Sequence, residues 1–321
     1  MDLFSYSTRR VRREGGRVVR SGRRHRRTDV MLRKMFKRQR TGSVVCASCG
    51  SLVGVNDEQC YTCGRRNPGL WGFGPLLRRL GSDFGFTALV VYGCSALYVV
   101  SLLLTFRDGQ NIMGGGPFSI LSPGNLAALR LGMSGAVPVS AGMWWTVLSA
   151  GWLHGSALHI LFNMMVMRQI GPAAADIYGG ARMVIIYTLA SVCGFVLSSL
   201  AGRVMPPLPI IGGAGFTLGA SGAIFGLVGA LLYYSRRTGS SLMTSQLSGY
   251  VLSMAVFGVL MPGIDNYAHA GGFAGGYLAG MWLDPLKRER VEHIAGAMAC
   301  LLATALAILV SFVWVTHYVV R

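Results

Sequence analysis

Apolar runs separated by short polar or Gly/Pro-rich connections fill the chain from Phe86 onward. Seven of these runs are long and charge-poor enough to predict membrane-crossing helices. They cover residues 86–106, 154–171, 182–202, 219–235, 247–262, 267–284 and 294–316. Several fall at or below the roughly 20 residues that a full crossing needs, which indicates a locally thinned bilayer or water entering from one side. The pattern predicts an all-α polytopic membrane protein.

Cationic residues set the predicted orientation, because connections on the cytosolic side of a membrane are enriched in Arg and Lys. With the N-terminus in the cytosol, the cation-rich connections all fall on that side. These connections are 168–182, 236–237 and 287–290. The outer connections carry only Arg107, Arg130 and Arg203. This topology places the C-terminus outside, and three Trp residues in the first outer connection, 108–153, predict that it rests on the membrane interface.

Composition agrees with a membrane protein, since 52% of the residues are apolar and only 13% are charged. The net charge of +18 is concentrated at one end, where residues 1–40 hold fifteen of the thirty Lys and Arg against three acids. This basic tail lacks apolar periodicity and is predicted to be disordered. We expect it to orient the protein and to bind anionic lipid headgroups, which disfavours nucleic acid as its partner.

The start of the chain lacks the features of a secretory signal peptide. No apolar stretch with a small-residue cleavage site follows the basic run within a dozen residues. The N-terminus is therefore expected to stay cytosolic. The expected location is a bacterial inner membrane, as an integral multi-pass protein.

Four cysteines between the tail and the first span have the spacing of a metal site. They are Cys46, Cys49, Cys60 and Cys63, which form two C-x-x-C pairs with ten residues between them. Gly50 and Gly64 follow the two pairs and let the backbone turn back toward the sulfurs. Four thiolates in two knuckles suit tetrahedral zinc, and the short intervening loop fits a small zinc ribbon.

Two disulfides are the alternative for these cysteines, but they need an oxidising compartment, whereas the basic tail places the segment in the reducing cytosol. A catalytic metal is disfavoured because protein ligands would fill all four positions. We therefore expect one structural zinc ion. Cys94, Cys193 and Cys300 stand alone in apolar runs and are interpreted as small core residues.

Polar residues able to act in catalysis lie near the outer ends of the second, fourth and sixth predicted spans. They are His154, His159, Asn163, Ser221 and His269. A helix rises about 1.5 Å per residue, so Ser221 and His269, each two or three positions into a span, lie at similar depth. Polar groups inside a membrane are expensive, which makes a functional role the first hypothesis for this set.

Small residues predict that the fourth and sixth spans approach closely. The fourth span carries Gly222 and Gly226, and the sixth carries Gly272, Gly276 and Gly280. Small residues four apart let helix backbones meet within lipid. Such contact would bring the Ser221 hydroxyl to the His269 imidazole, as an activated nucleophile requires. Ser221 also begins a helix, whose N–H groups favour a developing oxyanion.

Each of these features also has a purely structural interpretation. Glycine repeats are frequent packing devices, and a lone intramembrane Ser usually bonds a carbonyl one turn back. His159 and Asn163 share a helix face, where a packing hydrogen bond is as plausible as catalysis. The case for chemistry therefore depends on the set rather than on any one residue.

Three motifs in this set together resemble the rhomboid intramembrane proteases. They are H-x-x-x-x-H-x-x-x-N at His154, His159 and Asn163, G-x-S-G at Gly219–Gly222, and A-H-x-x-G-x-x-x-G at Ala268–Gly276. They occur in family order, and the resemblance covers roughly residues 86–290. It implies a catalytic dyad of Ser221 and His269 without an acidic third member. It also implies an oxyanion site built from the Ser221 backbone, His159 and Asn163, with His154 and Gly219 close by.

Two departures from the family pattern lie away from the dyad. Many members carry Trp-Arg in the first outer connection, whereas Trp145 is followed here by Thr146. A seventh span after the six-helix core occurs in only part of the family. Inactive members lack the nucleophile or the base, and both are present in this chain.

The resemblance implies a serine endopeptidase that cleaves transmembrane segments of membrane proteins through an acyl-enzyme. A non-catalytic rhomboid-like chaperone or trafficking factor that binds such segments is the alternative. The expected division of the chain is a disordered basic tail, a zinc-ribbon-like module, an interfacial linker, a six-helix protease core and a seventh transmembrane helix. Their bounds are 1–40, 41–68, 69–85, 86–290 and 291–321.

Overall fold

The computed structural model describes residues 39–46, 50–64, 66–72, 82–110, 112, 119–205, 212–261, 263–287 and 289–319. The predicted basic tail lies outside these residues except for its last two positions. Cys49 and most of the predicted interfacial linker also lie outside them.

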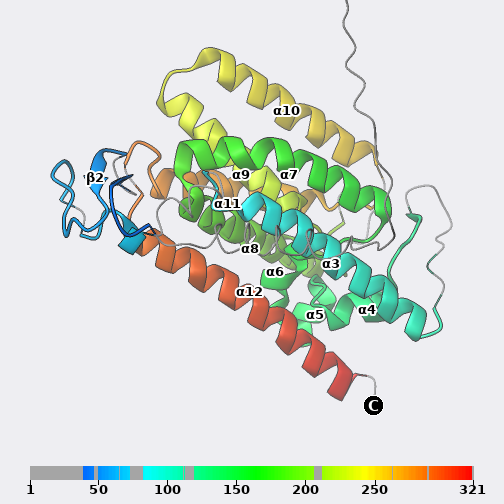
Figure 1. The fold of residues 1–321 in the computed structure, drawn as a ribbon. Helices are drawn as coiled ribbons and strands as arrows, with labels where there is room; N and C mark the ends of the chain where they lie inside the picture. Colours follow the sequence, from blue (N-terminus) through cyan, green and yellow to red (C-terminus); the bar gives the residue numbers. More distant parts are fainter. Residues whose placement is uncertain are drawn as a thin grey trace, which may run out of the picture.

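Within the part of the chain that the structure describes, seven long helices follow one another in the predicted order (Figure 1). They are α3 (Phe86–Arg107), α7 (Ala157–Tyr178), α8 (Gly180–Val204), α9 (Ser221–Arg237), α10 (Ser241–Leu260), α11 (Asn266–Trp282) and α12 (Val291–Tyr318). Within the described residues, α3, α8, α10 and α12 are long and apolar enough to cross a membrane. The chain is a mostly helical, multi-pass membrane protein, as the apolar pattern predicts.

The second span differs most from its predicted bounds. Helix α7 begins at Ala157 because Ser156 caps it, its hydroxyl accepting the His159 N–H at 3.3 Å. The prediction ends at the residue before Pro172, yet the helix continues through this proline to Tyr178. It stops at Gly179, whose φ of +84° lies in the region that favours glycine.

Helix α11 lies between α8 and α9 and packs against both. A Cβ built at Gly276 would lie 2.0 Å from the Gly226 carbonyl oxygen, and one at Gly272 would lie 2.1 Å from that of Gly222. These distances leave no room for any side chain, so the α9 and α11 backbones touch directly. The predicted close approach of the two helices is confirmed.

Arg182 belongs to the interior rather than to a solvated cytosolic loop. It lies near the start of α8 and is 3% exposed. One guanidinium nitrogen donates to the carbonyls of Leu283, Asp284 and Lys287 at 2.8 to 3.0 Å. Glu289 in turn accepts the Arg182 N–H at 3.0 Å, so the first turn of α8 is joined to the connection between α11 and α12.

The connection between α3 and α7, which is predicted to be the first outer connection, forms a compact layer of short helices. They are α4 (Asn125–Arg130), α5 (Ala136–Ser140), α6 (Thr146–Ser149) and the 3-10 turn η3 (Ala150–Trp152). Helices α4 and α6 contact the later part of α12 (Figure 1). The tryptophans expected at the membrane interface differ in exposure. Trp144 is 66% exposed, whereas Trp152 packs in the core against Phe86 and Tyr187.

The described cysteines of this region lie on a small two-stranded hairpin and on the turns that follow it, and the described residues of 43–72 are together called the hairpin below. Strand β1 (Ser43–Val45) pairs antiparallel with β2 (Leu52–Gly54), and the 3-10 turn η1 (Leu70–Gly72) follows. Three buried valines and two buried cysteines form its core. Figure 1 shows the hairpin beside the start of α12, at the opposite end of the helical bundle from the C-terminus.

Candidate active site

The Ser221 and His269 side chains meet between α9 and α11. Ser221 is the first residue of α9, and His269 lies in the first turn of α11. A hydrogen bond of 2.8 Å joins His269 Nε2 to Ser221 Oγ. At this distance a neutral imidazole accepts the hydroxyl hydrogen and can take the proton as the oxygen attacks a carbonyl.

The ring of Phe225 lies flat against the His269 imidazole. Their centroids are 4.5 Å apart and their planes are 17° from parallel. Phe225 is one turn after Ser221, so α9 supplies both the hydroxyl and a wall for the imidazole. Sequence reasoning missed this residue, although its position four residues after Ser221 places it on the same helix face.

Asp265 fixes the start of α11, one turn before His269. One carboxylate oxygen accepts the Ala268 N–H at 2.9 Å, which is an N-cap, and the other accepts the hydroxyl of Ser198 on α8. The Asp265 carbonyl accepts the His269 N–H at 3.2 Å. Sequence reasoning missed Asp265 as well, and the signal was an Asp two residues before a predicted helix start.

Gly219 brings His159 to the nucleophile. Its φ is +137°, and a Cβ built there would lie 2.8 Å from His159 Nε2 and 3.7 Å from Ser221 Oγ. The imidazole therefore occupies space that any other residue at position 219 would fill. His159 Nδ1 accepts the Gly155 N–H at 3.4 Å, which assigns the proton of a neutral ring to Nε2, the nitrogen nearest Gly219.

Asn163 and His154 are buried beside His159. The Asn163 side-chain amide donates to the His159 carbonyl at 2.9 Å, a bond within α7 that uses one of its two N–H groups. The His154 ring meets the His159 ring edge-on, with centroids 5.1 Å apart. The structure thus gathers all the polar residues selected from the sequence near the starts of α7, α9 and α11.

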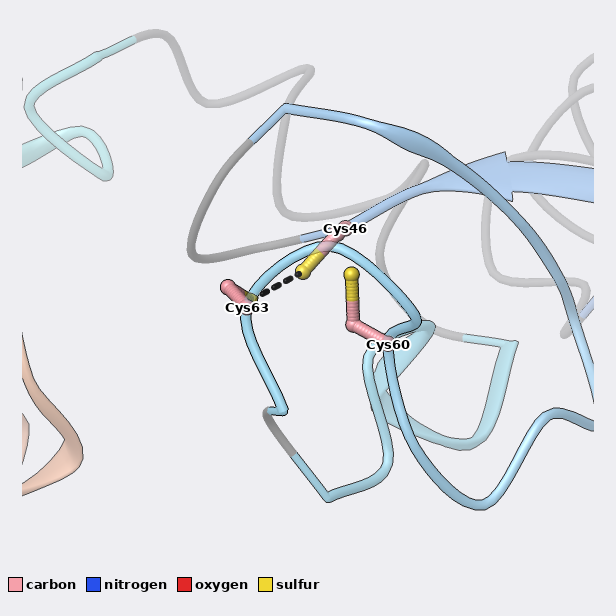
Figure 2. Close-up of side chains that lie close together, drawn as sticks. All are labelled: Cys46, Cys60 and Cys63. Atoms are coloured by element: carbon pink, nitrogen blue, oxygen red, sulfur yellow. Dashed lines mark hydrogen bonds between the residues drawn. The ribbon is translucent and has the colours of Figure 1, made fainter.

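Three cysteines of the hairpin point toward one another (Figure 2). The sulfurs of Cys46, Cys60 and Cys63 all lie within 4.8 Å of one another, and those of Cys46 and Cys63 are 3.8 Å apart. Sulfurs bound at about 2.3 Å to a tetrahedral zinc ion are about 3.8 Å apart, so this donor set fits the metal. A disulfide between Cys46 and Cys63 does not fit, since its sulfurs are about 2.05 Å apart.

Glycines shape both knuckles of the hairpin. Gly50 and Gly64 have φ values of +74° and +70°, and their N–H groups donate to the Cys46 and Cys60 carbonyls at 3.1 and 2.8 Å. Both glycines have the positive φ that the predicted turns need, but the bonds described for their N–H groups go to carbonyl oxygens rather than to sulfurs. Since Cys49 lies outside the described residues, the structure shows three cysteines that could bind a metal.

Comparison with known proteins gives matches that all carry rhomboid names. A family model of the rhomboid domain matches residues 141–285. RHOMBOID-like protein 4 of Arabidopsis thaliana is 38% identical over 144 residues, which cover 43% of this chain and 34% of that protein. Rhomboid protease GluP of Bacillus subtilis is 33% identical over 144 residues, covering 44% and 26%. YdcA of Bacillus subtilis, which also carries a rhomboid name, is 31% identical over 156 residues, covering 47% and 73%.

The chain spans about a third of the first of these relatives and about a quarter of the second. The matched domain includes both Ser221 and His269 and ends before α12. It excludes the cysteine hairpin. The family model therefore bears on the part of the helical bundle from the end of the first connection to the end of α11.

Proposed function

The chain belongs to the rhomboid family, and on this premise we propose that it is an intramembrane serine endopeptidase. It cleaves transmembrane segments of other membrane proteins. The observation that carries the proposal is the 2.8 Å hydrogen bond between Ser221 Oγ and His269 Nε2. Relatives named as proteases support the same class of reaction.

In the proposed acylation step, Ser221 Oγ attacks the carbonyl carbon of the scissile bond while its proton passes to His269 Nε2. The tetrahedral intermediate carries its negative charge on the former carbonyl oxygen. His269 then gives the proton to the leaving amine nitrogen, and the C–N bond breaks. A water molecule repeats the sequence on the acyl-enzyme, with His269 taking its proton, and Ser221 is regenerated as the new carboxyl end leaves.

The negative oxygen of this intermediate is assigned to the space beside Gly219. The His159 Nε2–H lies next to this glycine, and the N–H of Ser221 belongs to the first turn of α9. Donors fixed before the reaction stabilise charge that develops in the transition state. We assign the second N–H of Asn163 to the same task, while its first remains bound to the His159 carbonyl. His154 packs against His159 and supports its ring.

Labelling with a fluorophosphonate tests the nucleophile directly. The wild-type protein in detergent should be modified at Ser221 and should cleave a reporter transmembrane substrate. Ser221→Ala should lose both activities, and His269→Ala should lose nearly all, because the hydroxyl is a weak nucleophile without a base. Ser253→Ala, at an exposed serine of α10, is the matched control and should behave as wild type. Full cleavage by Ser221→Ala would exclude the mechanism.

The proposed topology has the N-terminus in the cytosol and the C-terminus outside, in a bacterial inner membrane. It is supported by the cationic connections and by the positions of the cysteine hairpin and C-terminus at opposite ends of the bundle (Figure 1). The dyad then faces the outer side, and the expected substrates are transmembrane proteins cut near their outer ends. The basic tail is proposed to bind anionic lipid headgroups.

The proposed cysteine module, residues 41–68, binds one structural zinc ion. Cys46, Cys60 and Cys63 supply three thiolates, and Cys49 is assigned as the fourth ligand from its spacing. Four protein ligands leave no coordination position for water, so the ion is assigned a structural role. A core of three valines and two cysteines is too small to fold without such support.

A further inference from the structure

Trp145, in the first outer connection, is bound to the seventh helix. Its indole Nε1–H donates to Ser311 Oγ at 3.0 Å across 166 residues of sequence. The Trp314 ring meets the Trp145 ring edge-on, with centroids 5.6 Å apart. Ser311 is fully buried and Trp145 is half-buried, so the bond lies between α12 and the connection. Figure 1 shows the later part of α12 running beneath α6, α5 and α4.

Ser311 also lies against the backbone of the same connection. Gly132 has a φ of +99°, and a Cβ built there would lie 2.9 Å from Ser311 Oγ and 2.1 Å from Ser149 Oγ. The Ser149 hydroxyl donates to the Gly132 carbonyl at 2.9 Å. Position 132 therefore admits only glycine, and the backbone at Gly132 lies against Ser311 of α12.

Two residues beyond Gly132, the connection pairs with the segment that leads into Ser221. Ser134 and Thr217 exchange backbone hydrogen bonds of 3.0 and 2.8 Å. The Gly219 N–H donates to the Ala150 carbonyl at 3.0 Å. The turn that presents the nucleophile is thus held by the outer connection at both of its ends.

Thr146 completes this arrangement at the position where many rhomboids carry Arg. Its side chain is fully buried, and its hydroxyl lies 2.7 Å from the Met143 carbonyl and 3.1 Å from Ser134 Oγ. The residue after Trp145 is therefore an internal link to the pair formed by Ser134 and Thr217. In this chain the Trp-Thr sequence connects α12 to the nucleophile turn rather than reaching for the membrane surface.

We propose that the outer part of α12 braces the nucleophile turn, with Trp145 and Ser311 as positioning residues for Ser221. The inference rests on the proposed serine-protease function. Ser311 contacts Trp145 and Gly132. The backbone pair of Ser134 and Thr217 then connects this part of the loop to the segment that ends at Ser221. Neither positioning residue touches the dyad.

The test uses the full chain in detergent and two ways of removing one hydrogen bond. Trp145→Phe keeps an aromatic ring and loses the N–H donor, while Ser311→Ala loses the acceptor. Trp144→Phe is the matched control, because its side chain is an adjacent tryptophan that is 66% exposed. Three quantities are measured on each preparation: the folded fraction, kcat and KM for a reporter substrate, and the rate of fluorophosphonate labelling at Ser221.

We expect Trp145→Phe and Ser311→Ala each to lower kcat and the labelling rate per folded molecule about fivefold, the effect of one net hydrogen bond on the placement of Ser221. KM should stay near its wild-type value. The double variant should be no worse than either single one, because both changes remove the same bond. Trp144→Phe should match wild type.

Unchanged kcat and labelling per folded molecule in both variants, with only thermal stability lowered, would overturn the inference and leave the proposed function standing. If Trp145→Phe fails to fold, the kcat and labelling rate of Ser311→Ala test the inference instead, because this substitution removes only one oxygen atom. A wild-type protein that neither cleaves nor labels would overturn the proposed function, and the inference with it. The two failures are therefore distinguishable.

Discussion

The two candidate sites of this protein are held together in opposite ways. At the dyad, α9 and α11 meet backbone to backbone through glycines, and Ser221 and His269 come together although 48 residues separate them. In the hairpin, Cys60 and Cys63 belong to one knuckle, and the hydrophobic core is a handful of small residues. The packing of α9 against α11 places Ser221 beside His269, whereas short loops place the cysteines of the hairpin beside one another.

This difference predicts which changes each site tolerates. The dyad depends on distances set by whole helices, so a single added side chain between α9 and α11 moves both reactive groups. The hairpin is expected to depend on the proposed zinc ion, because its small core supplies little folding energy. A substitution that separates α9 from α11 should abolish proteolysis, whereas a substitution that prevents metal binding in the hairpin should leave proteolysis intact.

The largest expected effect comes from separating the two central helices. Gly276→Leu places a side chain where a Cβ alone would lie 2.0 Å from the Gly226 carbonyl oxygen. We expect complete loss of both substrate cleavage and fluorophosphonate labelling, measured on membrane-extracted protein. Gly249→Leu is the control, because a Cβ at this glycine of α10 meets nothing within 4 Å. Retained activity in Gly276→Leu would show that the helices can part without displacing the dyad.

Asn163→Ala should cause a smaller, graded loss. Removing one donor to an oxyanion typically costs about a hundred- to a thousandfold in turnover, and the Ser221 N–H and His159 remain. Because the lost interaction strengthens in the transition state, kcat should fall more than KM rises. The bond from Asn163 to the His159 carbonyl supplies the competing explanation. If Asn163 acts only through that bond, thermal stability will fall while turnover per folded molecule stays unchanged.

Asp265 is expected to matter for stability first. Asp265→Ala removes the cap of α11 and the acceptor for the Ser198 hydroxyl, and loss of an N-cap costs about 1 kcal/mol. Asp265→Asn keeps an acceptor for the cap and should be milder, since Asn is an equally good capping residue. Thermal unfolding of the two variants checks this order. Equal unfolding temperatures for Asp265→Ala and wild type would remove Asp265 from the support of α11.

Much of the fold was predictable because apolar periodicity is a local property. The seven long helices of the described residues all follow from it, and the glycines four apart indicated that α9 and α11 touch. The bounds of α7 were predicted less well. Ser156 capped the helix later than the apolar run began, and the helix continued through Pro172. Those two outcomes depend on a side-chain bond and on tertiary packing, neither of which hydropathy reports.

The sequence predicted which residues form the candidate site and how deep in the spans they lie, but it did not predict which side chains touch. Ser221 and His269 could be placed at similar depth from their positions in the spans. Nothing in the sequence showed that Phe225 lies flat on the imidazole or that Trp145 meets Ser311 from 166 residues away. Such contacts depend on the rotation of each helix about its axis, which a pattern of apolar residues fixes only coarsely.

The smallest effect on proteolysis is expected from loss of the metal. Purified full-length protein should hold about one zinc ion per chain, as four thiolates in two knuckles require. Cys60→Ser should lose the ion, because its sulfur lies within 4.8 Å of those of Cys46 and Cys63. Cys300→Ser, at a lone cysteine of α12, should keep it. Metal analysis after purification without chelators compares the three proteins, and a zinc-free wild type would exclude the site.

The same variants separate the hairpin from the dyad. The proposed topology puts the hairpin on the cytosolic side and the dyad on the outer side of the membrane. Neither Cys60→Ser nor deletion of residues 1–68 should therefore change kcat in detergent by more than about twofold, which corresponds to only about 0.4 kcal/mol in the barrier. Thermal unfolding of the helical core should also be unchanged, because the rhomboid domain excludes the hairpin. A truncated protein that is folded but inactive would instead show that the module acts on the dyad through the start of α12, beside which it lies. Restoring zinc to metal-stripped full-length protein then distinguishes the two outcomes, because proteolysis returns with the metal only if the regions are coupled.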